Sequence, residues 1–282
     1  MHVMKRVVSS SKNNFLNDHQ IKGNKVLPMA VAVTSIAERA MHLYQGYSLV
    51  SISDTQLFAG ITINNEITTD LKVEELKTST DNTVQLKCLL STYNKQKKRC
   101  APGYRCTVVL SSQRPVKPSR GTGFKIGSTL LSQYNTRSLY NGTTLFHGPT
   151  FQDVVGVLKV NSKSITVQCN KGNQIGATYN HAVMGQYNGT KDSIALDVVM
   201  QTFLIWARHE RNVAALPTGA KTIEYYGSLV SGKDYYITLS GEDNMNSAKD
   251  ATWNATFNVH DAAGYVYIRG SASVTLHDNL KY

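Results

Sequence analysis

The chain has 282 residues, 41% of them hydrophobic, and a formal net charge of +11 at pH 7. This length allows one large domain or two small ones with a sizeable core, and the hydrophobic fraction is typical of a soluble globular protein. The positive charge indicates an acidic partner, such as nucleic acid, an anionic membrane or an acidic protein. No arginine-rich arm, zinc-finger spacing or aromatic RNA-binding motif is present, so we do not expect a nucleic-acid partner.

Cysteine usage and the apolar segments indicate the environment of the chain. The cysteines form no C-x-x-C pair and have no metal-ligand spacing, so we expect reduced thiols, although a bridge between Cys100 and Cys106 stays open. Residues 1–14 lack the apolar core of a signal peptide, and the apolar run 26–37 is too short to cross a bilayer. We therefore expect a soluble, cytoplasmic protein with no membrane insertion. The four cysteines are Cys88, Cys100, Cys106 and Cys169.

The first half of the chain is predicted to contain one buried helix and several strands. Pro28 suits the start of a helix, and the sequence from Met29 onward is apolar on nearly every side, which is typical of a buried helix. Alternating and β-branched segments separated by asparagine-containing turns predict antiparallel strands. These strands are expected at 3–10, 48–63, 67–77, 83–93 and 104–112.

The same order of elements follows a segment rich in proline, glycine and basic residues at 113–128, which we interpret as a linker. The run 193–209 is again apolar nearly all round and predicts a second buried helix. We therefore divide the chain into a half at 1–112, a linker at 113–133 and a half at 134–282, with no residue-level repeat. Strands of the second half are expected at 151–160, 164–169, 221–230, 234–240, 252–260, 264–269 and 272–277.

The first candidate functional residue is His19, which precedes the first buried helix. It is followed by Gly23 and Pro28 in the spacing H-x-x-x-G-x-x-x-x-P. Glycine permits a backbone conformation that a Cβ would hinder, and proline fixes the start of the helix. An imidazole held on such a turn beside an apolar helix is suited to be a general base.

The second candidate pair is Asp197 and Gln201, inside the second apolar helix. An aspartate in an apolar helix is unfavourable unless it is paired or used. Positions i and i+4 share one face of a helix, so Gln201 can hydrogen-bond Asp197 or a polar group that Asp197 contacts.

Two further segments carry rigid turns. In the first, His147 precedes Gly148 and Pro149, and its ring could line a pocket or pack in the turn. The second is the pair Leu216-Pro217, which we expect as a turn that leads into a strand.

Together these segments resemble the dehydratase domains of polyketide synthases and of polyunsaturated-fatty-acid synthases, over most of the chain from Phe15 to about Tyr282. His19, Gly23 and Pro28 match the family's H-x-x-x-G-x-x-x-x-P motif, and Asp197 and Gln201 match its D-x-x-x-Q/H motif. The segment from Phe146 to Pro149 stands for the G-Y-G-P region, with histidine where many members have tyrosine. The Leu216-Pro217 pair matches the family's Leu-Pro element.

The resemblance implies an α+β fold called a double hot-dog, in which two antiparallel curled sheets each surround a central buried helix. It also implies removal of water from a 3-hydroxyacyl thioester on an acyl carrier protein, giving a 2-enoyl thioester. His19 is expected to be the base, Asp197 the acid, and Gln201 the group that orients Asp197 or the departing hydroxyl. Substrate-binding residues are expected at Gly23, Pro28, His147, Gly148 and Pro149.

The resemblance implies no metal or redox cofactor, because the substrate is carried on the phosphopantetheine of the carrier protein. The carrier and other synthase components are the expected partners, and a homodimer is possible. Three alternatives stay open: a cyclase of the product-template type, a hot-dog thioesterase, and a non-catalytic scaffold domain.

Overall fold

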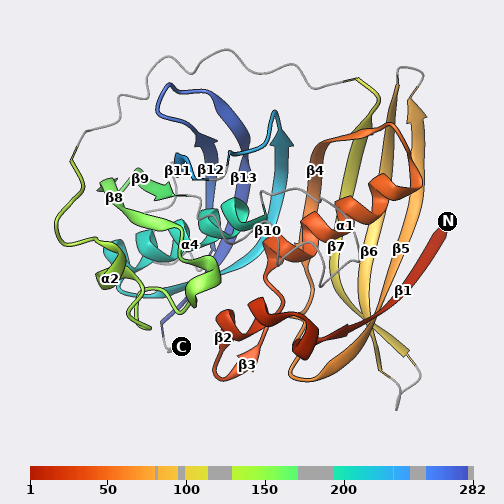
Figure 1. The fold of residues 1–282 in the computed structure, drawn as a ribbon, viewed down its shortest axis with the longest axis horizontal. Coiled ribbons are helices and arrows are strands. Elements are labelled where there is room, and N and C mark those ends of the chain that lie inside the picture. The colour runs from red at the N-terminus through yellow and green to blue at the C-terminus, as the bar shows by residue number, and fades with distance from the viewer. Residues whose placement is uncertain are drawn as a thin grey trace.

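The computed structural model describes residues 1–79, 82–94, 99–113, 129–170, 193–230, 232–241 and 252–278. Its long strands form one eleven-stranded antiparallel sheet, and two long helices lie against that sheet (Figure 1). The helices are α1 (Met29–Leu43), the short α2 (Thr136–Leu139) and α4 (Ser193–Arg211). The strands are β1 (His2–Ser9), β2 (Gln20–Ile21), β3 (Asn24–Lys25), β4 (Ser48–Leu57), β5 (Glu66–Ser79), β6 (Thr83–Asn94), β7 (Arg99–Ser111), β8 (Val154–Asn161), β9 (Ser164–Asn170), β10 (Ala214–Tyr225), β11 (Asp234–Gly241), β12 (Thr252–His260) and β13 (Val266–His277).

The two halves of the chain share this sheet, whose strand order is β1, β5, β6, β7, β4, β10, β13, β12, β11, β9, β8. The expected pair of separate, curled sheets is not confirmed, because β10 of the second half pairs directly with β4 of the first. Gly219 permits this junction, since a Cβ there would overlap the backbone carbonyl of Thr55 in β4. The coarser expectation, a mostly antiparallel sheet around two buried helices, is confirmed.

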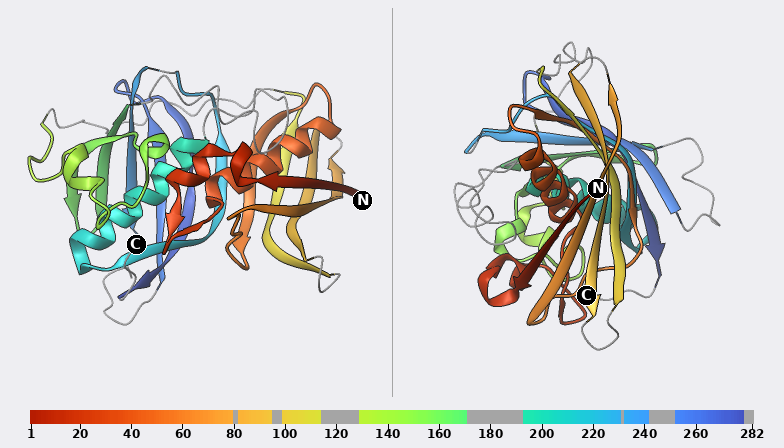
Figure 2. Two further views of the ribbon diagram at one scale, coloured as in Figure 1. Left: turned by 60° about the horizontal axis from the view of Figure 1, so that its bottom comes forward. Right: turned by 90° about the vertical axis from the view of Figure 1, so that its right-hand side faces the viewer.

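Helices α1 and α4 are buried, as their apolar sequences predicted. Every residue of α4 from Ser193 to Ala207 is buried, and so are most residues of α1. Helix α1 contacts β4, β6 and β7, whereas α4 contacts β8, β9, β10 and β11. The two helices also contact each other, and Figure 2 shows them following one another along the length of the molecule.

Several predicted strand boundaries are wrong. The strand expected at 221–230 is β10, which begins at Ala214, so Pro217 lies within a strand rather than in a turn before it. A break in the pairing with β13 between Pro217 and Gly219 accommodates the proline, which has no N–H for the ladder. The strands expected at 264–269 and 272–277 are one strand, β13.

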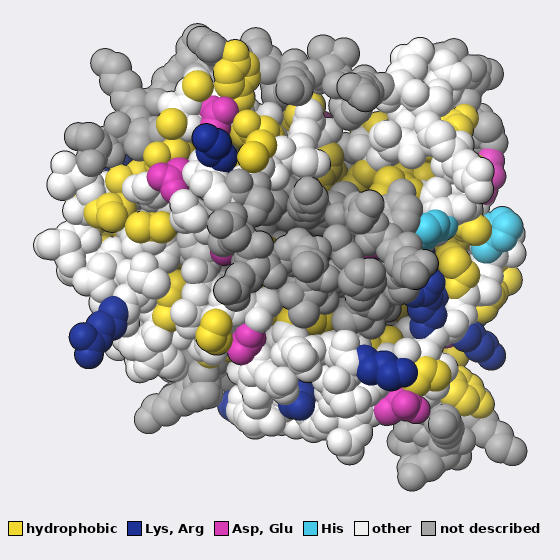
Figure 3. Space-filling model, viewed as in Figure 1, with side chains coloured by type: hydrophobic (Ala, Val, Ile, Leu, Met, Phe, Trp, Pro, Cys, Tyr) yellow, Lys and Arg dark blue, Asp and Glu magenta, His cyan; other side chains and the backbone are white. Residues whose placement is uncertain are grey.

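The expected linker cannot be compared with the structure over most of its length, because residues 114–128 lie outside the described residues. All four cysteines are free, so Cys100 and Cys106 form no bridge. Within the described part of the chain, no helix has both the length and the apolar character needed to cross a membrane. The lysine and arginine side chains visible in Figure 3 are spread over both halves of that face.

Candidate active site

His19 is positioned by a tight hairpin directly after it. Strands β2 and β3 are joined by Lys22 and Gly23, whose φ angles of 50° and 73° are those of a two-residue hairpin turn. The hairpin returns the chain to Val26, whose N–H donates to the His19 carbonyl at 3.1 Å. The predicted role of Gly23 as a residue of unusual backbone conformation is therefore confirmed.

The hairpin also selects the tautomer of His19. Its Nδ1 lies 2.8 Å from the carbonyl oxygen of Val26. A carbonyl oxygen can only accept, so Nδ1 carries the proton and Nε2 of the neutral ring keeps its lone pair. The loop after β4 fixes Val26 in turn, because residues 26 and 62 form a β-bridge and Leu27 donates to Ile61.

Aromatic rings surround His19 and exclude water from it. The ring of His19 lies 5.1 Å from that of Phe146 and 5.6 Å from that of Phe151, measured between centroids. Burial lowers the pKa of His19 from its ordinary 6.5 to about 4, although the hydrogen bond to Val26 opposes this shift. His19 is therefore a neutral imidazole throughout the physiological range.

Asp197 lies near the start of α4 and is 3% exposed. Burial raises the pKa of Asp197 from 3.8 to about 7, the hydrogen bond from Gln201 opposes the rise, and Asp153 adds to it. The nearby N-terminus of α4 favours the anion, so burial outweighs the helix dipole at this position. Below pH 7 Asp197 is therefore mainly a protonated acid.

Gln201 holds Asp197 in a network of hydrogen bonds, as the i, i+4 spacing predicted. The side-chain nitrogen of Gln201 donates to Asp197 at 2.9 Å and to the Phe151 carbonyl at 3.0 Å. Its side-chain oxygen accepts from the hydroxyl of Tyr140 at 2.8 Å. With both ends of its amide engaged, Gln201 cannot turn away from the carboxyl group.

The loop that carries His147 is attached to the first half of the chain through Asp18. The Asp18 carboxylate accepts from the backbone N–H of Thr150 at 3.1 Å and from its hydroxyl, while the Asp18 carbonyl accepts from Gly148. A Cβ at Gly148 would overlap the Asp18 carboxylate. The Gly-Pro turn therefore docks directly beside the residue that precedes His19.

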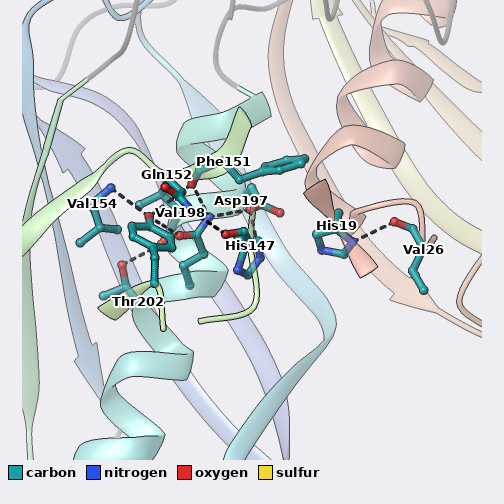
Figure 4. Close-up of polar contacts among 11 residues, drawn as sticks. His19, Val26, His147, Phe151, Gln152, Val154, Asp197, Val198 and Thr202 are labelled. Atoms are coloured by element: carbon teal, nitrogen blue, oxygen red, sulfur yellow. Dashed lines mark hydrogen bonds and ion pairs between the residues drawn. The ribbon is translucent and has the colours of Figure 1, made fainter. Parts of the chain in front are cut away.

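These elements bring His19, His147 and Asp197 together from three distant parts of the sequence (Figure 4). One potential ligand atom from each residue lies within 4.8 Å of the other two. His147 Nε2 lies 3.5 Å from the Asp197 carboxyl, and the rings of the two histidines are 5.3 Å apart. Burial and the neighbouring His19 lower the pKa of His147 well below 6.5, so both imidazoles are neutral.

The other residues named from the sequence lie around this centre in different ways. Pro28 is buried and caps the start of α1, and Pro149 begins a 3-10 turn that ends at Phe151. Gly23 is exposed at the hairpin tip, where its conformation, rather than a side chain, matters. Asp18 and Tyr140 were not predicted, since each acts through a tertiary contact that no local spacing announces.

Comparison with known proteins finds a similar sequence and similar structures. No family model matches the chain. Over 277 residues it is 30% identical to a polyunsaturated fatty acid synthase subunit of Thraustochytrium sp., and this match covers 98% of the chain. The chain spans only 10% of that much longer protein.

Solved structures of dehydratase domains share the fold. A trans-AT polyketide synthase dehydratase domain from Brevibacillus brevis matches with a TM-score of 0.76 at 13% identity, covering 98% of this chain and 94% of that one. Two inactive mutants of the CurK dehydratase, with histidine replaced by phenylalanine and aspartate by asparagine, match with TM-scores of 0.74 and 0.73. Each mutant is 14% identical to this chain. The two matches cover 99% and 98% of this chain, respectively, and 93% of each mutant chain. The resemblance to polyketide and polyunsaturated-fatty-acid synthase dehydratase domains is confirmed, and the chain has their hot-dog fold.

Proposed function

We propose that this chain is a dehydratase that removes water from a 3-hydroxyacyl thioester carried by an acyl carrier protein. The product is a 2-enoyl thioester. The observation that carries the proposal is the pair formed by His19 and Asp197, which lie close together in complementary protonation states. At pH 6 the imidazole is neutral with a bare Nε2, and the carboxyl group still holds its proton.

The reaction uses this pair directly. His19 Nε2 takes a proton from C2 of the acyl chain, and the electrons of that C–H bond form the C2–C3 double bond. The C3–O bond breaks, and Asp197 gives its proton to the departing hydroxyl, which leaves as water. The two inactive CurK mutants support these assignments, because the residues replaced there are also a histidine and an aspartate.

The surrounding residues are proposed to position the reacting groups. Gln201 orients the Asp197 carboxyl through the hydrogen bond at 2.9 Å. The N-terminus of α1 after Pro28 supplies backbone N–H groups for the negative charge that develops on the thioester oxygen. His147, Gly148 and Pro149 are proposed to line the acyl chain beside Asp197, and Gly23 to act through the hairpin that holds His19.

The proposed partner is the carrier protein itself. An acidic carrier and the phosphate of its phosphopantetheine arm would be attracted by the net charge of +11. The halves at 1–112 and 134–282 are proposed to be duplicated hot-dog units that each contribute one catalytic residue. This function implies a cytoplasmic location and requires no metal or redox cofactor.

Mass spectrometry of 3-hydroxyacyl carrier proteins incubated with the protein tests the proposal. We expect loss of one water from the acyl chain by the wild-type protein and by His42→Gln, which alters a histidine outside the site. His19→Ala and Asp197→Asn should abolish that loss. Substrates that stay intact across several chain lengths, or a hydrolysed thioester in place of the enoyl product, would refute the proposal.

A further inference from the structure

The centre of the site has the composition of a metal site as well as that of an acid–base pair. His19, His147 and Asp197 are all buried, and each offers one ligand atom within 4.8 Å of the other two. Two imidazole nitrogens and a carboxylate oxygen are ligands that zinc accepts in proteins. The proposed dehydration uses His19 and Asp197 but requires no proton transfer by His147.

Two of the three side chains are oriented by a hydrogen bond that leaves a ligand atom available. His19 donates through Nδ1 to the Val26 carbonyl at 2.8 Å, which orients its ring and leaves Nε2 for an ion. Asp197 is fixed by the hydrogen bond from Gln201. His147 differs from the other two, because its Nδ1 atom has no hydrogen-bond partner among the described residues although the side chain is buried, so the ring carries an unused polar atom into the site.

The spacing is close to that of a bound ion. His147 Nε2 and Asp197 Oδ2 are 3.5 Å apart, and two zinc ligands at bond lengths of about 2.0 Å in tetrahedral geometry are about 3.3 Å apart. An ion at the centre of a triangle with 4.8 Å sides would lie about 2.8 Å from each corner. Shifts of at most about 0.8 Å per atom therefore bring all three atoms to bonding distance.

We propose that His19, His147 and Asp197 form a binding site for a divalent transition-metal ion, expected to be Zn²⁺, and that bound Zn²⁺ inhibits the protein. The ion would take the Nε2 lone pair of His19 and the carboxylate of Asp197, and a water would complete its coordination. The inhibition rests on the proposed dehydratase function, whereas the binding does not.

Isothermal titration calorimetry of the tag-free, chelator-treated protein with ZnCl₂ tests the binding. We expect one ion per chain with a dissociation constant in the micromolar range or below, and Co²⁺ should give the visible absorption of a four- or five-coordinate ion. His147→Phe should weaken binding at least 30-fold, and Asp197→Asn should do the same while keeping the shape of the side chain. His277→Gln, at the end of β13, is the matched control and should bind normally.

The outcomes separate the two proposals. No binding of Zn²⁺, binding unaffected by both site variants while their thermal melts show folded protein, or a cobalt–thiolate absorption band would overturn the metal site. Zn²⁺ binding without any dehydration of carrier-protein substrates would leave the site standing and refute the proposed function. Dehydration that Zn²⁺ does not inhibit at saturation would refute the inhibitory role.

Discussion

The pH dependence of kcat/KM follows directly from the two perturbed groups. In the proposed mechanism activity requires neutral His19 and protonated Asp197, whose pKa values are about 4 and about 7. At pH 8 only about one tenth of the Asp197 carboxyl groups keep their proton, so kcat/KM should be about tenfold lower than at pH 6. At pH 5 about nine tenths of His19 is still neutral, whereas an ordinary histidine would be about 3% neutral.

A soluble 3-hydroxyacyl thioester of N-acetylcysteamine is the substrate for this profile, because it avoids titration of the carrier protein. Gln201→Leu supplies the internal control. In the wild-type protein the hydrogen bond from Gln201 lowers the pKa of Asp197. Loss of this bond in the variant should therefore move the alkaline limb of the pH profile to higher pH. A kcat/KM that rises between pH 6 and 8.5, or an alkaline limb unmoved in this variant, would refute the assignment of Asp197 as the acid.

Three further substitutions test other contacts. Asp197→Asn should raise the melting temperature at pH 8 relative to wild type. The raised pKa of Asp197 makes the wild-type free energy of unfolding fall by about 4 kcal/mol as pH rises from about 4 through 7, and the neutral amide avoids this loss. A difference in melting temperature between variant and wild type that does not grow with pH would contradict this. Asp18→Ala removes both hydrogen bonds to Thr150 and should cost about 2–4 kcal/mol in urea unfolding, and a double-mutant cycle with Thr150→Val that shows no coupling would contradict the contact. Gly23→Ala places a Cβ in open space at φ 73° and should cost about 1–2 kcal/mol from backbone strain alone, so an unchanged melting temperature would show that the turn relaxes.

The elements that a sequence pattern describes locally were predictable, and those that depend on tertiary pairing were not. The two helices were predictable because a helical segment that is apolar on all sides is stable only when it is buried. The start of β10 was misplaced because Pro217 is a turn signal by composition, and only the break in pairing beside it makes it tolerable in a strand. Nothing in either half announces that β4 and β10 pair and join the halves into one sheet.

The candidate site divides in the same way. His19, Asp197 and Gln201 stand at spacings that carry their own physical meaning. Asp18 gives no periodic signal, because its partner Thr150 lies 132 positions away in the sequence. The sequence around Tyr140 gives no signal either, because its hydroxyl reaches Gln201 only after the loop before β8 packs on α4. Long-range contacts of this kind need the folded chain to become visible.

One physical cause accounts for the shifted pKa values of both members of the proposed acid–base pair. Removing water disfavours every charged form, so it makes the imidazole of His19 a weaker base and the carboxyl of Asp197 a weaker acid. Opposite protonation states at one pH therefore need no special neighbour for either group, only a shared apolar enclosure. That enclosure exists when the His147 loop is docked on Asp18, because rings on this loop cover His19. It follows that a substitution which loosens the docking should move both limbs of the pH profile inward, toward the ordinary pKa values of the two side chains.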